Sequence, residues 1–321
     1  MRTTGVVLVL AEPTDGEAQL VEEQLHDRGV HTARFDTAEF PRNTALTARL
    51  GSLGWQGVLP GSELDLDDVS AVYYRQPPPF TLPPGLSQAE ARFAQIEARF
   101  GLGGVLASLE ARWLPGSPGR VADAEYKPVQ LATATRAGLR CPNTVVTNDP
   151  VSAHTFAEQS PAGAVYKVFM HKLCTDNDEP KLIYTAPVPS SEIDDRVAST
   201  AHQFQHDLTT EKIFDARVVA TRRGCLATSI RSDDPSARRD FRLGYGGALS
   251  YEPVEVPAPV AAGCRTYLAN LELTTGVFDF CVTVEDWFFL ECGPGAQWAW
   301  LEEATGAPMA ALIAEELTAS P

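Results

Sequence analysis

The sequence lacks the short patterns that most readily identify a cofactor site. Its six cysteines are dispersed, with neither a CxxC pair nor zinc-ligand spacing, and are interpreted as reduced core residues. There is no GxSxG segment, no GxxxxGK[ST] segment and no GxGxxG opening a helix. A nucleophile elbow, a P-loop and a Rossmann site therefore lack support. The apolar runs are too short to span a bilayer, and the first residues do not resemble a signal peptide, so a cytoplasmic protein is expected.

Positive charge is also scarce. The chain has 26 lysines and arginines against 42 aspartates and glutamates, a formal charge of −16. This balance argues against nucleic acid or an anionic membrane as the main partner. A nucleotide is still possible, because it needs only a local cluster of basic groups. With 321 residues, 44% of them hydrophobic, the chain is expected to be globular with two or three subdomains.

The first third of the chain has the pattern of an α/β unit. The expected elements are strands at 5–10, 30–35 and 69–75, and helices at 15–28 and 87–112. In the last of these helices, Phe93, Ile96 and Phe100 recur at helical intervals. The Pro- and Gly-rich stretch 113–119 is a plausible domain boundary.

Beyond this boundary, helical and strand patterns are mixed. The expected helices are 127–137 and 301–317, and the expected strands are 144–147, 164–169, 182–188, 213–219 and 225–230. Residues 174–181 are polar and are expected to form a loop. The overall prediction is a mixed α/β fold.

Two carboxylates stand out in residues 277–298, VFDFCVTVEDWFFLECGPGAQW. Asp279 and Glu291 lie in successive apolar strands, where burying a charge is costly unless it is compensated. A three-residue turn at 284–286 would place them directly opposite each other. A divalent cation between them would relieve their repulsion, so a magnesium site is the economical interpretation. If the turn differs by one residue, the two side chains point to opposite faces.

Three cations lie in or near strands upstream of these carboxylates: Lys167, Arg217 and Arg242. For each arginine alone, a salt bridge is the simpler explanation, Asp215 with Arg217 and Asp240 with Arg242. Together with a paired-carboxylate metal site, the three cations suggest a polyphosphate held by side chains and magnesium.

The order of these residues, followed by Glu-x-x-Pro before a final helix, resembles the ATP-grasp fold. Longer segments are more specific, namely RFDTAEFP (34–41), VYYRQP (72–77), KPVQLATATRAGLRCPNTVVTNDP (127–150) and FLECGPGAQWAWLEEATGAP (289–308). They resemble the ATP-grasp ligases that mature ribosomal peptides, the microviridin-type or graspetide macrocyclases, over nearly the full length. The resemblance implies an N-terminal pre-ATP-grasp domain (1–115), a central subdomain (116–203) and a C-terminal subdomain with the Mg-ATP site (204–321).

The resemblance also implies an activity. ATP phosphorylates an Asp or Glu side chain of a precursor peptide, and a Ser or Thr hydroxyl or a Lys amine attacks the acyl phosphate, giving an ω-ester or an ω-amide. By position, Lys127 and Lys167 match nucleotide-binding lysines, and Phe204 and Gln205 fall where adenine is contacted. Arg217 and Arg242 match basic residues near the reacting phosphates, and Asp279 and Glu291 match the magnesium ligands.

One position departs from the family pattern, which ends Glu-x-Asn-Pro with the asparagine as a further magnesium ligand. Here the order is Glu291, Cys292, Gly293, Pro294, and a water could replace the missing oxygen. This departure leaves open the number of metal ions. It also leaves open the catalytic rate and the alternative of a non-catalytic subunit that binds the leader peptide. A ligase of small amino acids is a separate alternative. A homodimer is expected from the resemblance only.

Overall fold

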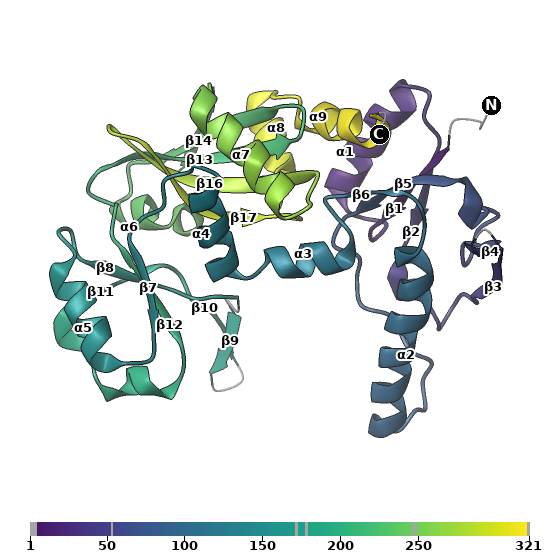
Figure 1. Ribbon diagram of the computed structural model, residues 1–321, viewed down its shortest axis with the longest axis horizontal. Coiled ribbons are helices and arrows are strands. Elements are labelled where there is room, and N and C mark those ends of the chain that lie inside the picture. Colours follow the sequence, from purple (N-terminus) through teal and green to yellow (C-terminus); the bar gives the residue numbers. More distant parts are fainter. Residues whose placement is uncertain are drawn as a thin grey trace.

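The computed structural model describes residues 5–319 apart from 53, 171–172, 177–178, 246 and 248, and gives no side-chain detail for 173–176 and 179–182. Figure 1 shows three groups of elements: the N-terminal elements at one end, a central sheet at the other and the C-terminal sheet bridging them. In the described part of the chain, no helix is long and apolar enough to cross a bilayer.

The N-terminal part is built on a four-stranded parallel sheet in the order β2-β1-β5-β6. Its strands are β1 (Val6–Leu10), β2 (Thr32–Phe35), β5 (Val69–Tyr74) and β6 (Arg112–Leu114). The continuous apolar run of β1 suits a parallel strand that is covered on both faces. Val7 and Val9 pack in one core with helix α1 (Gly16–Asp27), whereas Leu8 and Leu10 pack in another with helix α2.

Helix α2 (Gln88–Ala107) begins with a capping box between Ser87 and Glu90. It ends five residues before the predicted end, because the chain then turns into strand β6. Its second half is buried through Leu102, Val105 and Leu106, but its first half projects from the domain (Figure 1). Phe93 in this first half is 66% exposed, and Phe100, early in the second half, is 72% exposed on the face that points away from the core. A separate two-stranded sheet of β3 (Thr47–Gly51) and β4 (Gly54–Val58) completes this part.

The central part is a four-stranded antiparallel sheet in the order β11-β8-β12-β7. Its strands are β7 (Thr144–Thr147), β8 (Ala164–Lys167), β11 (Ala186–Val188) and β12 (His202–His206), with helix α5 (Pro150–Gln159) packed beside them. Helices α3 (Pro118–Ala124) and α4 (Lys127–Arg136) connect it to the N-terminal sheet. Where the sequence predicted a polar loop, strands β9 (Leu173–Asp176) and β10 (Glu179–Leu182) form an antiparallel hairpin.

The C-terminal part is a five-stranded antiparallel sheet in the order β15-β14-β13-β16-β17. Its strands are β13 (Lys212–Thr221), β14 (Cys225–Ser232), β15 (Leu249–Val254), β16 (Thr275–Thr283) and β17 (Trp287–Gly293). Helix α6 (Pro235–Arg239) lies between β14 and β15, and helix α7 (Ala258–Asn270) packs on the core of the sheet.

The predicted C-terminal helix is in fact two helices, α8 (Ala299–Thr305) and α9 (Met309–Thr318). Gly306 ends α8 in the left-handed region at a φ of 70°, and Pro308 follows two residues later. Helix α9 brings Ile313 into one apolar core with Val7 of β1 and Val277 of β16. The N-terminal and C-terminal sheets therefore share a core.

Candidate active site

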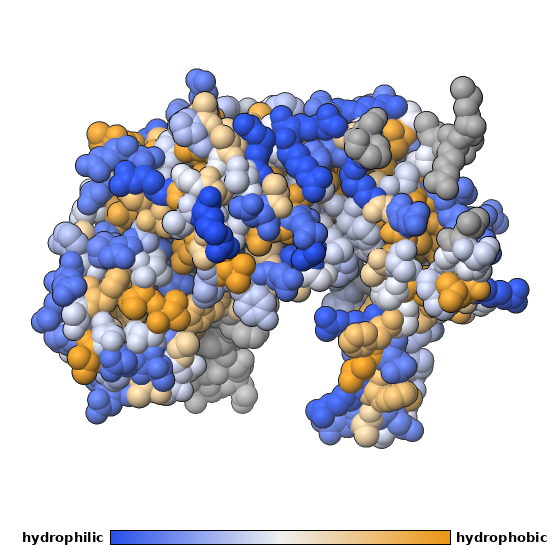
Figure 2. Space-filling view, in the orientation of Figure 1, coloured by the Kyte–Doolittle hydropathy of each residue, from blue (hydrophilic) through white to orange (hydrophobic). Residues whose placement is uncertain are grey.

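A cleft of about 1250 Å³ lies between the N-terminal part and the other two parts. Figure 2 shows the molecule hollowed between α2 and the body that faces it. Six of the eight predicted site residues line this cleft: Lys127, Lys167, Arg217, Arg242, Asp279 and Glu291. They come from α4, β8, β13, the loop after α6, β16 and β17. Segments far apart in the sequence thus meet in one place.

Asp279 and Glu291 lie directly opposite each other on β16 and β17, as predicted, but not for the predicted reason. Val282 pairs with Trp287, and Thr283 N–H donates to Asp286 O at 2.9 Å, so the turn is one residue shorter than expected. A β-bulge at Leu290 inserts one residue into β17 and restores the pairing. The bulge thus re-aims Glu291 toward the same side as Asp279.

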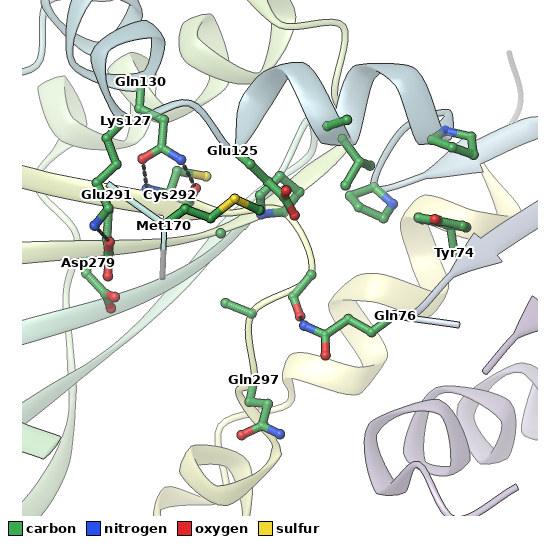
Figure 3. A pocket seen from close by; sticks show the side chains of 18 of the residues that line it. Tyr74, Gln76, Glu125, Lys127, Gln130, Met170, Asp279, Glu291, Cys292 and Gln297 are labelled. Carbon is green, nitrogen blue, oxygen red and sulfur yellow. Dashed lines mark hydrogen bonds and ion pairs between the residues drawn. The ribbon is translucent and has the colours of Figure 1, made fainter. Parts of the chain in front are cut away.

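Each carboxylate has a cationic neighbour. Lys127 Nζ, on the first turn of α4, forms an ion pair with Glu291 (Figure 3). Arg217 lies opposite Asp279 in the β13–β16 ladder, with its Nη1 3.6 Å from Asp279 Oδ1. These side chains are mostly shielded from water, where an ion pair is screened less than at the surface. The arrangement places two cations against two anions at one end of the cleft.

The two simpler salt bridges expected from the sequence have different outcomes. Asp240 does pair with Arg242, whose Nε donates to Oδ1 at 2.7 Å. Asp215, however, does not pair with Arg217. Its oxygens accept two hydrogen bonds from Lys212 Nζ, at 2.8 and 3.0 Å. Arg217 is therefore turned toward Asp279 and the cleft.

Lys167 stands at the end of β8 and faces the same charged region. Burial, reinforced by the positive charges of Lys127 and Lys212, lowers the pKa of Lys167 to about 8, with Glu291 acting in the opposite direction. The charged form of this lysine is disfavoured in the free protein, and it is stabilised when an anion binds beside it. Such an ammonium is suited to binding a phosphate.

Gln130 was not predicted from the sequence, but it holds β17 next to Glu291, the candidate metal ligand. Its Nε2 donates to Cys292 O at 2.8 Å, and its Oε1 accepts from Cys292 N–H at 3.2 Å. The same Nε2 donates to Ala124 O at 2.7 Å. Figure 3 shows Gln130 reaching Cys292 beside Glu291. No local pattern signals this role, because it depends on α4 packing against β17.

Phe204 and Gln205, predicted to contact adenine, are not among the described residues that line the cleft. Phe204 is 3% exposed and packs in the core of the central sheet against Tyr166. Gln205 Nε2 donates to Thr144 Oγ1 at 2.9 Å. Both backbone edges of β12 are paired, with β7 on one side and β8 on the other. Their place is thus within the sheet.

The residues present fit a magnesium ion that is held partly by a nucleotide. Carboxylate oxygens are ligands that magnesium prefers, and it commonly takes one or two carboxylates together with substrate phosphates. The described residues contain no group of three or more His, Cys, Asp or Glu that could hold a metal. At position 293, a Cβ would lie 2.6 Å from Ala296 Cβ, so a larger residue cannot enter without a shift. Asp279 and Glu291 are therefore a pair of carboxylates in the cleft that could hold such an ion.

Comparisons with known proteins agree with this geometry. Residues 6–117 match the family model of the MvdD pre-ATP grasp domain. The chain is 25% identical to macrocyclase MdnC from Microcystis aeruginosa MRC, solved with its precursor peptide MdnA, over 98% of this chain and 99% of that one, with a TM-score of 0.81. It has the ATP-grasp fold.

Two further ATP-grasp structures share the architecture at lower identity. A Chryseobacterium gregarium RiPP-associated ligase, solved with ADP and a leader and core peptide, is 23% identical over 98% of this chain and 95% of that one, with a TM-score of 0.86. Ligase PsnB, complexed with a minimal precursor, Mg and ADP, is 21% identical over 99% of this chain and 97% of that one, with a TM-score of 0.74. No curated protein sequence matches the chain. The resemblance to ATP-grasp peptide macrocyclases drawn from the sequence is confirmed.

Proposed function

We propose that the protein is an ATP-dependent macrocyclase of a ribosomally made precursor peptide. It transfers the γ-phosphoryl group of ATP to an Asp or Glu side chain and joins that carbonyl to a Ser or Thr hydroxyl or a Lys amine, releasing phosphate. The observation that carries the proposal is the single cleft in which Asp279 and Glu291 face each other beside Lys127, Lys167 and Arg217. MdnC and the Chryseobacterium ligase, which share the fold, were each solved with peptide substrates.

This geometry supports the following roles for the charged residues. Lys127 and Lys167 bind the phosphates of the nucleotide, and Asp279 and Glu291 hold magnesium, which neutralises charge on those phosphates. Arg217 and Arg242 stabilise the negative charge that moves between the phosphoryl group and the peptide carboxylate. Phosphoryl transfer depends on such positioning and charge neutralisation more than on a protein nucleophile. The adenine contact predicted for Phe204 and Gln205 is not part of the proposal, because both lie within the central sheet.

The N-terminal side of the cleft supplies room for a peptide. It is lined by Tyr74, Trp113 and the proline run at 77–79, and has few charged groups. Ligand pockets are lined mostly by apolar and aromatic side chains with a few polar groups, so this wall supports binding of a peptide opposite the phosphate site. The division into parts 1–115, 116–203 and 204–321 and a homodimeric state belong to the same proposal.

The experiment is incubation of the protein with ATP, magnesium and the precursor peptide encoded beside it. Each link should lower the peptide mass by one water, with one ATP consumed per link. A peptide that binds yet keeps its mass would contradict the proposal. Phosphate release with free amino acids alone would indicate a ligase of small amino acids. If Asp279→Asn leaves the peptide product of the cell unaltered, the protein is a non-catalytic leader-binding subunit.

A further inference from the structure

The loop that follows strand β17 is held by a buried ion pair of the N-terminal sheet. Arg75 follows β5, Glu17 lies in the first turn of α1, and their ion-paired side chains are 4% and 5% exposed. The Arg75 guanidinium also donates a 2.5 Å hydrogen bond to Gly295 O, and its Nε lies 3.5 Å from Asp15 Oδ2. A buried arginine needs such partners, and here one of them belongs to the active-site loop.

Glu17 contacts the same loop at its other end. Its Oε1 accepts hydrogen bonds from the backbone N–H groups of Trp298 and of Ala299, the latter at 3.0 Å. These groups open helix α8, whose own N-cap residue makes no side-chain cap bond. Unpaired N–H groups at a helix start are normally satisfied by a nearby side chain. Glu17 therefore supplies this cap from the N-terminal part.

Gln76 adds a third contact to the loop. Its Nε2 donates to Gly295 O at 2.6 Å, so consecutive residues, Arg75 and Gln76, bond to one carbonyl oxygen. Gln76 does so at a φ of +42°, a conformation that non-glycine residues adopt uncommonly. A Cβ at position 295 would lie 3.2 Å from Gln76 Cγ, so the contact also favours glycine there. Figure 3 shows Gln76 meeting the loop on the side of the cleft away from Asp279.

We propose that Arg75 and Glu17 are positioning residues for the peptide step, and this rests on the function proposed above. They fix the segment 293–298 against the N-terminal sheet, and most of this segment lines the cleft. The nucleotide side has independent anchors. Strand β17 is held there by its ladder with β16, by Gln130 and by Lys127. Loss of the ion pair should therefore displace the peptide side of the cleft and leave the nucleotide side in place.

The test compares Arg75→Met and Glu17→Gln with Arg34→Met. Arg34 pairs with Glu22 of helix α1, which also carries Glu17, and donates to the backbone oxygens of residues 12 and 13 outside the loop, so this variant is a matched control. For Arg75→Met and Glu17→Gln, we expect Mg-ADP affinity within about twofold of wild type and a kcat for peptide crosslinking lower by roughly 10- to 100-fold, the cost of a small misplacement. Arg75→Lys should recover part of kcat, because lysine keeps the charge but lacks the planar fork. Arg34→Met should leave both values unchanged.

Two further measurements keep the outcome decisive. If a single variant fails to fold, the double variant Arg75→Met/Glu17→Gln can be used. It removes both charges of the pair, so that neither is left buried without its partner. Backbone hydrogen exchange in 293–299 should be faster in Arg75→Met than in Arg34→Met. Unchanged exchange, or Mg-ADP affinity falling as much as kcat, would overturn the positioning role. If the wild type forms no crosslinks, the proposed function fails, and the exchange and ADP measurements still decide whether the ion pair positions the loop.

Discussion

The two walls of the cleft are built from different kinds of side chain. The wall formed by α4, β8, β13, β16 and β17 carries charges in pairs, Lys127 with Glu291 and Arg217 with Asp279. The N-terminal wall carries aromatic rings and prolines, with Arg99 of α2 as its cation. A charge network suits the nucleotide phosphates, which are the same in every reaction. An apolar wall suits a peptide, whose side chains vary. Under the proposed function, the charged wall would carry out the chemistry and the N-terminal wall would recognise the shape of the peptide.

The largest effect is expected on the charged wall. Asp279→Asn keeps the shape of the side chain but removes the charge that would hold magnesium, and crosslinking should fall by on the order of 10³-fold. Peptide mass after a fixed reaction time measures the loss, and thermal unfolding reports whether the fold is retained. Glu315→Gln, at an exposed position of α9, is the matched control and should change neither value. An Asp279→Asn protein that is unfolded at the assay temperature would show this carboxylate to be structural.

The next effect is a pH dependence carried by Lys167. Because the pKa of Lys167 in the free protein is about 8, its ammonium is lost as the pH rises through that value, and Mg-ADP affinity should fall with it. Above the pKa the decrease should approach about tenfold per pH unit. Calorimetric titrations on both sides of the pKa, with wild type and Lys167→Met, measure it. An identical pH profile in the variant would assign the dependence to another group.

The lowered pKa of Lys167 also affects stability. Nucleotide affinity should fall as the pH rises, whereas the stability of the nucleotide-free protein should increase. A lysine whose folded pKa is lowered destabilises the fold while it is charged, and that cost is relieved as the pH rises from the folded pKa of about 8 toward the ordinary lysine pKa of 10.5. The free energy of unfolding of the nucleotide-free protein should therefore gain an upward slope in this window from Lys167. Lys167→Met should lack this contribution in denaturant titrations.

A smaller effect is expected on the N-terminal wall. Arg99→Gln removes the cation of that wall from an exposed helical position that lines the cleft. It should raise the KM for an acidic precursor peptide by about threefold, as expected for the loss of one solvent-exposed charge contact, and leave Mg-ADP affinity unchanged. Steady-state kinetics with varied peptide measures this split. A drop in nucleotide affinity would mean that the two walls are not specialised in this way.

The smallest effect concerns position 293. Gly293→Asn would bring a Cβ to 2.6 Å from Ala296 Cβ, so the substitution should cost about 1–3 kcal/mol of stability through overpacking. The double variant Gly293→Asn/Ala296→Gly removes the clashing methyl group and should recover most of that loss. Denaturation midpoints of the two variants measure the difference. Equal midpoints would show that Ala296 is not what favours glycine at this position.

Features of the site that depend on local sequence could be predicted, whereas those that depend on contacts between distant segments could not. Asp279, Glu291 and Lys167 could be found because charged residues in apolar strands are conspicuous by themselves, whereas Lys127 was found only through the family resemblance. The pairing of Asp279 with Glu291 was predicted correctly, but from a turn of the wrong length. The bulge at Leu290, which offsets the shorter turn, has no local signal in the sequence. The split of the C-terminal helix, in contrast, was available in Gly306 and Pro308.

Residues that act through other residues could not be predicted. Gln130 and Glu17 are ordinary helix residues until α4 packs on β17 and α1 meets the start of α8. Phe93 and Phe100 have the spacing of a buried helical face, yet both are exposed, because α2 packs on the core through Leu102, Val105 and Leu106 instead. In each case the deciding contact, or its absence, depends on where distant elements lie.

The most direct test of the central claim follows an oxygen atom. A precursor peptide in which both side-chain carboxyl oxygens of every Asp and Glu are a heavy oxygen isotope is incubated with the protein, ATP and magnesium. If the side-chain carboxylate takes the γ-phosphoryl group and is then attacked at its carbonyl carbon, each released phosphate must carry one labelled oxygen from the peptide. Crosslinked peptide accompanied by unlabelled phosphate would contradict the account.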